Sequence, residues 1–272
     1  MMNWEETIKY ARGKSEYSDL IKQAYLSDDL EDNVKRYRES EEYSEIKKLI
    51  TKYGENAETV LDVGSGNGIS AVSFALDGFN VVSVEPDKSE TVGAGAVKIL
   101  KRIYSLDNLR IIKSIAEEAD VKNEEFDLVF VRQALHHAAD LDKFVQNIAK
   151  YLKRGGLFLA VREHVIFDES DKQIFLKTHP LNGFYGGENA FTEDEYLTAF
   201  KKAGLDVVSV LLFFDSVINY FPMSSENATK IKSQNVLVKI LKKLAEIMLK
   251  RDYIIDERDI PGRMYSFIAV KK

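Results

Sequence analysis

The sequence contains no cysteine, which excludes disulfide bonds, thiolate metal sites and cysteine nucleophiles. No apolar run approaches the length needed to span a membrane, and the acidic residues Glu5 and Glu6 interrupt any signal-peptide pattern. Basic residues are not in excess, because 38 Lys and Arg face 44 Asp and Glu. Proteins that bind the phosphate backbone of nucleic acid usually have such an excess. We therefore expect a cytoplasmic protein with no nucleic-acid partner and no stable membrane insertion.

The composition and the apolar pattern together indicate an α/β protein. Hydrophobic residues make up 45% of the 272 residues, enough for the core of one large domain with appendages. Short strand-like runs cover residues 59–63, 81–85, 109–113, 126–132 and 157–164. Between them, apolar residues recur every three or four positions over residues 68–77, 91–104 and 141–153. This alternation predicts a mostly parallel, doubly wound sheet with helices on both faces.

The two ends of the chain depart from this alternation. Residues 1–54 are polar and lack a strand-like run, so they predict two or three helices, the last ending at Tyr53 with Gly54 as a left-handed cap. Near the other end, Thr192 and Glu195 match a capping box that opens a helix to about residue 203. Further strands at 206–214 and 263–271 bring the predicted number of strands to seven.

Two segments have the properties of insertions into a domain over residues 55–272. Residues 165–191 are too long for an ordinary connection, which is typical of a functional loop. Residues 215–258 predict a helical insertion, because residues 227–251 form a long amphipathic, Lys-rich pattern.

The stretch from Leu61 to Gly68 places a strand directly before a glycine turn and the start of a helix. Gly64 and Gly66 allow a tight turn and a close approach of the backbone to a ligand, and a helix N-terminus offers free N–H groups. The G-x-G-x-G spacing differs from the G-x-G-x-x-G of dinucleotide-binding folds. Glu85 ends the next strand, where a carboxylate can accept both hydroxyls of a ribose. These features predict a site for a ribose-containing cofactor.

These motifs resemble those of the class I S-adenosylmethionine-dependent methyltransferases. The resemblance extends from about residue 59 to residue 204 and rests on residues 60–68, 85–87, 126–130 with 135–137, and 152–156. It implies a Rossmann-like sheet of seven strands with an antiparallel last strand, and S-adenosylmethionine as cofactor with S-adenosylhomocysteine as product. It also implies that the helices of residues 1–54 form a lid over the cofactor, with Tyr37 and Ser40 as candidate contacts.

The resemblance assigns cofactor-binding roles to residues at the carboxyl ends of the first four strands. The glycine loop would line the methionine part, Glu85 the ribose and Pro86 the adenine. The complete predicted set is Asp62, Gly64, Ser65, Gly66, Gly68, Glu85, Pro86, Ile115, Ala116, Arg132 and Gln133. Many relatives carry an acidic residue where Ile115 stands, so here the backbone or Glu117 would have to hold the adenine amino group.

Transfer of a methyl group from a sulfonium needs positioning of the acceptor and, for a hydroxyl, removal of its proton. Ligands of open α/β sheets bind at the carboxyl ends of the strands, so bases are expected after the fourth and fifth strands. The candidates there are His136, His137, Glu163 and His164. A structural role is the alternative for each, because a histidine can pack against a helix and Glu163 can pair with Arg162.

The segment 165–191 carries polar side chains among three glycines beside the predicted pocket. Such groups suit a small hydroxylated, sugar-like acceptor, although a rigid turn is the alternative. The candidate substrate-binding residues are Arg162, His179, Tyr185, Glu188 and Asn189. No metal site is predicted, because Asp140 and Asp142 are expected to cap the following helix.

Two other functions remain open at this stage. A nicotinamide-dependent oxidoreductase would share the turn and the acid, although the glycine spacing disfavours it. A non-catalytic module could keep the cofactor site and act by docking a partner. Methylation of nucleic-acid bases is disfavoured, because Arg132-Gln-Ala-Leu-His stands where an Asn/Asp-Pro-Pro-aromatic motif would be expected. The acceptor atom and the oligomeric state do not follow from these motifs.

Overall fold

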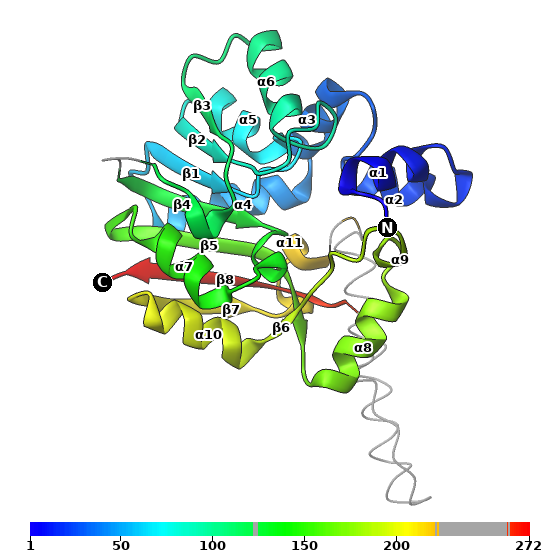
Figure 1. The fold of residues 1–272 in the computed structure, drawn as a ribbon. Coiled ribbons are helices and arrows are strands. Elements are labelled where there is room, and N and C mark those ends of the chain that lie inside the picture. Colours follow the sequence, from blue (N-terminus) through cyan, green and yellow to red (C-terminus); the bar gives the residue numbers. More distant parts are fainter. Residues whose placement is uncertain (122–124, 221, 223–259, 261) are drawn as a thin grey trace, which may run out of the picture.

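The computed structural model describes residues 1–121, 125–220, 222, 260 and 262–272, and it contains one large twisted sheet (Figure 1). The strand order is β3-β2-β1-β4-β5-β8-β7, and β6 pairs with β5 beside this path. The strands are β1 Thr59–Val63, β2 Asn80–Val84, β3 Leu109–Ile112, β4 Phe126–Arg132, β5 Leu152–Ile166, β6 Phe191–Thr192, β7 Leu205–Leu211 and β8 Met264–Lys271. Strands β1 to β5 pair in parallel, whereas β8 is antiparallel to both β5 and β7. The predicted fold is confirmed, with the two-residue β6 as an addition.

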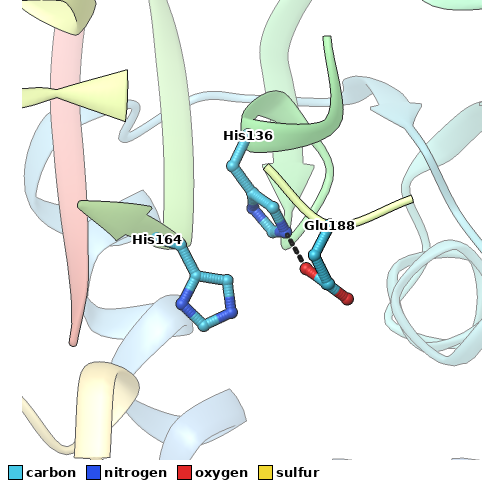
Figure 2. Close-up of side chains that lie close together, drawn as sticks. All are labelled: His136, His164 and Glu188. Carbon is cyan, nitrogen blue, oxygen red and sulfur yellow. Dashed lines mark ion pairs between the residues drawn. The ribbon is translucent and has the colours of Figure 1, made fainter. Parts of the chain in front are cut away.

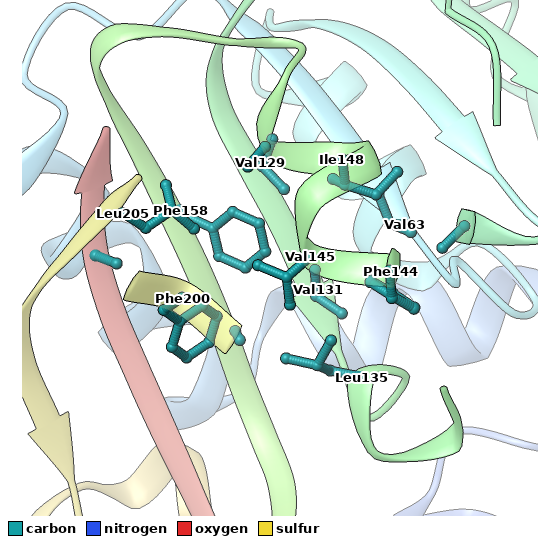
Figure 3. Packing of buried hydrophobic residues seen from close by; sticks show 14 of the residues in the cluster. Val63, Val129, Val131, Leu135, Phe144, Val145, Ile148, Phe158, Phe200 and Leu205 are labelled. Atoms are coloured by element: carbon teal, nitrogen blue, oxygen red, sulfur yellow. The ribbon is translucent and has the colours of Figure 1, made fainter. Parts of the chain in front are cut away.

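Helices cover both faces of the sheet, as the alternating pattern predicts. On one face lie α7 Leu141–Ala149 and α10 Glu193–Lys202, whose side chains share a core cluster with Phe158 of β5 (Figure 3). The other face is covered by α3 Leu30–Arg38, α4 Glu41–Tyr53, α5 Ile69–Leu76, α6 Ala94–Ile103 and α11 Val217–Tyr220. Capping residues set several starts: Thr192 and Glu195 form the predicted capping box of α10.

Several predicted boundaries are wrong; the strand expected over residues 206–214, for example, ends at Leu211. The helix expected over residues 141–153 ends at Ala149, and β5 already begins at Leu152. Gly155 has φ +76°, a conformation that glycine adopts easily. It lies where the pairing of β5 with β4 is irregular and does not cap a helix. At the start of α7, the Lys143 N–H donates to Asp140 Oδ1 (2.9 Å), so Asp140 is the predicted helix cap.

The N-terminal region forms four α-helices rather than two or three. Besides α3 and α4, it contains α1 Trp4–Arg12 and α2 Ser18–Gln23, joined by a 3₁₀ turn at Ser15–Tyr17. The last helix ends at Tyr53 as predicted, but Gly54 has φ −138° and is not a left-handed cap. Helices α1 and α2 lie apart from the sheet and pack beside α9 Asn182–Tyr185 (Figure 1).

The segment 165–191 is more regular than the predicted loop. Strand β5 continues to Ile166, and α8 Glu169–Thr178 and α9 follow, with Asp168 capping α8. Of the predicted insertion 215–258, residues 215–220 and 222 are described, and the helix expected at 227–251 lies outside the described residues. Among the helices that are described, none is long and apolar enough to cross a membrane.

A bulge in β5 changes which residues face which side of the sheet. The pairing of β5 with β8 shifts between Ala160 and Glu163, and Arg162 adopts φ +60°. Ala160, before the shift, and Val165, after it, both belong to the core cluster on the α7 face, although an odd number of positions separates them. Because strand side chains alternate with a period of two, the bulge reverses their facing. It thereby turns Glu163 toward the 3₁₀ turn Leu135–His137 that follows β4.

Candidate functional site

A cavity of about 500 Å³ opens at the carboxyl ends of the parallel strands. The glycine loop after β1 and the acid after β2 line one end, and four histidines line the other. The volume lies within the range typical of small-molecule sites, roughly 300–1,000 Å³. The cavity is therefore large enough for a small-molecule ligand.

The glycines of the loop serve two different needs. Gly64 has φ +70°, and a Cβ there would lie 2.3 Å from the Cβ of Ala134, so the residue permits close packing of the loop on the segment after β4. Gly66 has φ +54°, and a Cβ there would meet no atom closer than Val92 O at 3.9 Å. The backbone at Gly66 therefore faces open space in the cavity, which a ligand can approach.

Glu85 follows β2 and fixes the shape of the loop. Its Oε2 accepts the N–H of Gly66 (2.7 Å), and its Oε1 accepts the N–H of Asp87 (2.9 Å). Burial raises the pKa of the Glu85 carboxyl to about 7. A carboxylate has about four lone-pair positions, so Glu85 can still accept hydroxyl donors from a ligand in the cavity.

Asp62 and Gly68 support the loop from below and do not line the cavity. The Ser70 hydroxyl donates to Asp62 Oδ2 (2.7 Å), which ties the end of β1 to the first turn of α5. Burial raises the pKa of the Asp62 carboxyl to about 6. A Cβ at Gly68 would lie 2.9 Å from Val97, so this glycine allows α5 to pack on α6.

The predicted adenine side contains Pro86, Ile115 and Ala116, all of which line the cavity. Ile115 is 45% exposed and offers no polar side-chain atom. Glu117 also lines the cavity, and its Oε1 accepts the N–H of Ala139 (3.2 Å). The predicted replacement of a family acid by backbone groups or Glu117 is compatible with this geometry.

Arg132 and Gln133 line the cavity where β4 ends. Arg132 donates through Nε to Glu42 Oε1 (2.6 Å) on α4, and Glu42 is fully buried. Gln133 has φ +51°, an uncommon conformation for a residue other than glycine. The ion pair between Arg132 and Glu42 fastens the N-terminal helices to the sheet beside the cavity. No sequence pattern predicted this role of Glu42.

All four histidines of the chain line the second end of the cavity. His136 and His137 lie on the 3₁₀ turn after β4, His164 lies near the end of β5, and His179 follows α8. The rings of His136 and His164 lie 4.7 Å apart, centroid to centroid. Burial lowers the pKa of His136 and of His164 well below the usual value, so both imidazoles are neutral near pH 7.

Glu163 stands behind His136 and does not line the cavity. Its Oε2 lies 2.7 Å from His136 Nδ1 and accepts the N–H of His136 at 2.9 Å, and its Oε1 accepts the N–H of Ala134 (3.3 Å). Burial raises the pKa of the Glu163 carboxyl to about 7. Glu163 therefore orients His136 and leaves the opposite ring nitrogen, Nε2, directed toward the cavity.

Two other groups complete this end. His137 is exposed, and its Nδ1 lies 2.9 Å from the carbonyl oxygen of Gly187. A carbonyl can only accept, so Nδ1 carries the hydrogen, and in the neutral ring Nε2 keeps a lone pair. Glu188 receives a hydrogen bond from the Tyr185 hydroxyl, and its Oε1 lies 3.5 Å from His179 Nε2.

The sequence profile of the methyltransferase domain matches residues 34–210, well over half of the chain. The chain belongs to this family. The match begins in α3 and ends in β7, so it covers the glycine loop, Glu85 and both histidine-bearing strand ends. The resemblance to class I S-adenosylmethionine-dependent methyltransferases is thereby confirmed.

Curated members of the family align with part of the chain. The uncharacterized methyltransferase YcgJ of Bacillus subtilis is 31% identical over 140 residues, which are 47% of this chain and 51% of that protein. A ubiquinone biosynthesis O-methyltransferase of Rickettsia prowazekii is 30% identical over 115 residues, 41% of this chain and 43% of that protein. The chain thus matches about half the length of these two relatives.

The methyltransferase fold extends beyond the aligned part. A putative sarcosine dimethylglycine methyltransferase from Galdieria sulphuraria superposes with a TM-score of 0.57 at 17% identity. The superposition covers 85% of each chain. At this identity the likeness concerns the fold alone.

Of the substrate-binding candidates, His179, Tyr185 and Glu188 line the cavity, whereas Arg162 and Asn189 do not. Arg162 is buried and donates through Nη1 to the carbonyl of Ile218 (2.6 Å). Tyr37 and Ser40, the expected lid contacts, are also buried away from the cavity.

The roof of the cavity is formed by α1, α2, α9 and the residues that flank them. Besides the predicted Tyr185, it contains residues that the sequence did not single out, namely Trp4, Leu20, Ala24, Leu26 and Leu181. The rings of Trp4 and Tyr185 lie 4.9 Å apart. The side chain of Asn67 in the glycine loop donates to the carbonyl of Tyr25 (2.6 Å), which links roof and loop. Amphipathic helices are common, so no local signal marked these residues as cavity-lining.

Proposed function

We propose that this chain transfers a methyl group from S-adenosylmethionine to a hydroxyl of a small polar, sugar-like acceptor. The observation that carries the proposal is the shape of one cavity, which joins the glycine loop and Glu85 to all four histidines of the chain. The first end suits the cofactor and the second suits an acceptor whose proton must be removed.

The residues at the first end fit the cofactor. Glu85 would accept the ribose hydroxyls, the open backbone at Gly66 would face the methionine part, and Pro86 would lie against the adenine. When bound, S-adenosylmethionine supplies a methyl group already activated on a sulfonium. The protein therefore has to hold the acceptor oxygen in line, exclude water and remove a proton.

His137 is the group we propose as the base. The carbonyl of Gly187 holds its Nδ1–H, so the unprotonated Nε2 can take the hydroxyl proton as the oxygen–methyl bond forms. His136 also lines the cavity and is the alternative base; Glu163, which lies behind it, holds its Nδ1. Several relatives are ubiquinone biosynthesis O-methyltransferases, which supports an oxygen acceptor.

The roof formed by α1, α2 and α9 supports a further part of this proposal. We infer that residues 1–54 act as a lid, together with the segment 165–191, because both contribute side chains that close one side of the cavity. The lid would exclude water from the sulfonium and the acceptor oxygen during transfer.

Calorimetric titration of the purified protein tests the cofactor. We expect saturable binding of S-adenosylmethionine and S-adenosylhomocysteine, no binding of NAD, and weaker binding in Glu85→Ala. Loss of hydrogen bonds to a charged acceptor costs about 1.5–3 kcal/mol, which is roughly a 10- to 150-fold loss of affinity. Glu90→Ala, an exposed carboxylate outside the cavity, is the matched control.

The acceptor class is tested next, by measuring release of S-adenosylhomocysteine with a panel of sugars, other polyols and amines. Turnover with hydroxyl compounds supports the proposal, and turnover with amines alone contradicts an oxygen acceptor. Binding of NAD in place of both sulfur compounds would replace the proposal by an oxidoreductase function.

A further inference from the structure

Three lone-pair atoms converge at the histidine end of the cavity. They belong to His136, His164 and Glu188, whose potential ligand atoms all lie within 4.8 Å of one another (Figure 2). His136 Nε2 lies 3.7 Å from Glu188 Oε2. The side chains of His136 and Glu188 are 2% and 6% exposed, so these atoms face one another with little access to water.

The hydrogen positions make this convergence unusual. His136 Nδ1 is held by Glu163, and His164 Nδ1 lies 2.9 Å from the carbonyl oxygen of Gly262, which can only accept. With Glu163 ionised and both rings neutral, both Nδ1 atoms carry the hydrogen, and both Nε2 atoms keep a lone pair. Glu188 Oε2 is buried and has no hydrogen-bond partner among the described residues. Acceptors that face one another without a hydrogen between them repel, unless a cation lies between them.

We propose that His136, His164 and Glu188 bind a divalent transition-metal ion. Two imidazoles and one carboxylate form the ligand set of known catalytic zinc and non-haem iron sites, and such sites keep a position open for a substrate. Ligand atoms of a tetrahedral zinc site lie about 3.3 Å apart, given Zn–N distances of about 2.0–2.1 Å. The observed spacing needs only small side-chain movements to reach this value.

The surroundings of the two histidines match those of metal ligands. A metal-bound imidazole usually donates its other N–H to a carboxylate or a backbone carbonyl, which fixes the ring and its tautomer. Glu163 serves His136 in this way, and the Gly262 carbonyl serves His164. The Tyr185 hydroxyl likewise holds Glu188. The nitrogen-rich set favours Zn²⁺, Co²⁺ or Fe²⁺ over Mg²⁺, which prefers oxygen ligands.

The ion would act on the acceptor, a step that rests on the proposed function. A hydroxyl bound to the ion loses its proton more readily, because the ion stabilises the alkoxide. The proton would pass to His137 Nε2, the oxygen–methyl bond would form, and the methyl–sulfur bond would break with its electron pair left on sulfur. Two adjacent hydroxyls could occupy open positions together, which favours vicinal diols such as those of sugars.

Zn²⁺ titration of chelator-treated protein, in the absence of cofactor, tests the site. We expect saturable binding of one ion per chain by calorimetry. Co²⁺ in place of Zn²⁺ should give visible absorption bands typical of nitrogen and oxygen ligation, a readout independent of activity. Mg²⁺ should not displace either ion.

The variants separate ligands from neighbours. His164→Ala and the isosteric Glu188→Gln should lose most of the Zn²⁺ affinity and the Co²⁺ bands. Glu163→Gln, which keeps the shape of the side chain but removes the charge behind His136, should weaken binding by about 10- to 100-fold. His137→Ala is the matched control, because it removes a histidine of the same cavity that lies outside the ligand set, and its Zn²⁺ affinity should be unchanged. Circular dichroism of each variant checks that it is folded.

The outcomes distinguish this inference from the proposed function. Failure of folded wild-type protein to bind Zn²⁺, Co²⁺ and Fe²⁺, or unchanged Zn²⁺ binding in folded His164→Ala, overturns the metal site. Full methyl transfer in the presence of a strong chelator overturns it as well and leaves the methyltransferase function intact. Protein that binds Zn²⁺ but not S-adenosylmethionine contradicts the proposed function alone.

Discussion

The glycine loop and Glu85 come from one continuous stretch, residues 59–87, whereas the histidine end is assembled from three segments of the chain. The first end presents mainly backbone groups and one carboxylate, and its shape depends on glycines with positive φ. The second end presents side chains, whose positions depend on a bulge in β5, a 3₁₀ turn and the segment after α8. Substitutions at the first end should therefore affect folding and cofactor affinity together, and those at the second should affect metal binding and chemistry.

The largest effect is expected at the histidine end. His137→Ala should lower the rate of methyl transfer by about 10²- to 10⁴-fold, because it removes the proposed base. S-adenosylmethionine affinity should stay at the wild-type value, since His137 is not one of the proposed cofactor-binding residues. S-adenosylhomocysteine release with an acceptor found in the screen measures the first quantity and calorimetry the second. An unchanged rate would assign the base to another group.

At the loop end, Gly64→Ala should destabilise the protein by roughly 2–5 kcal/mol. The positive φ costs about 1–2 kcal/mol and the contact with Ala134 about 1–3 kcal/mol. Denaturant unfolding measures the change. Gly78→Ala is the control, because Gly78 has φ +96° with no atom near the added Cβ, so only about 1–2 kcal/mol should be lost. Equal losses at both glycines would contradict the close packing at Gly64.

The pH dependence of cofactor affinity should distinguish the ends further. The pKa of Glu85 is raised to about 7, and only its ionised form can accept both ribose hydroxyls. Affinity should thus be maximal above pH 7 and fall as the pH drops through 7, by up to about tenfold per unit. Glu85→Gln should bind weakly at every pH with a flatter profile. A wild-type affinity that rises on acidification would contradict this role of Glu85.

The smallest effect is expected in the roof. Trp4→Ala removes a ring that lines the cavity and contacts Tyr185, so S-adenosylmethionine affinity should fall by about 2- to 10-fold, equivalent to roughly 0.5–1.5 kcal/mol. Tyr10→Ala removes a similar ring contact, with Phe184 at 5.1 Å, outside the cavity, and serves as control. Equal losses in both variants would indicate a general weakening of α1 instead of a cavity contact.

The same contrast explains which features could be predicted from the sequence. A buried parallel strand followed by a glycine turn is a local pattern, so β1, β4, the loop and Glu85 were placed correctly. The error at residues 150–153 arose because Gly155 and Gly156 are typical of helix ends, whereas here pairing with β4 extends β5 to Leu152. Tertiary pairing outweighed the local signal.

The histidine end was predicted only in part. His136, His137, His164 and Glu188 were named as site residues, because they follow strand ends or lie in a long insertion. Their convergence depends on contacts between segments far apart in the chain, including the bulge at Arg162 that turns Glu163 beneath His136. No spacing rule for metal ligands covers such an arrangement, so the sequence alone predicted no metal site.

The bond between Asn67 and the Tyr25 carbonyl has a thermodynamic consequence. It makes the closed position of the N-terminal helices depend on the same loop that would contact the cofactor. If cofactor binding favours the closed position of these helices by some factor, closure raises the affinity for the cofactor by the same factor, because coupling between two equilibria is reciprocal. A substitution in α1 or α2 can therefore change the affinity of the protein for its product even when the substituted residue does not contact the product.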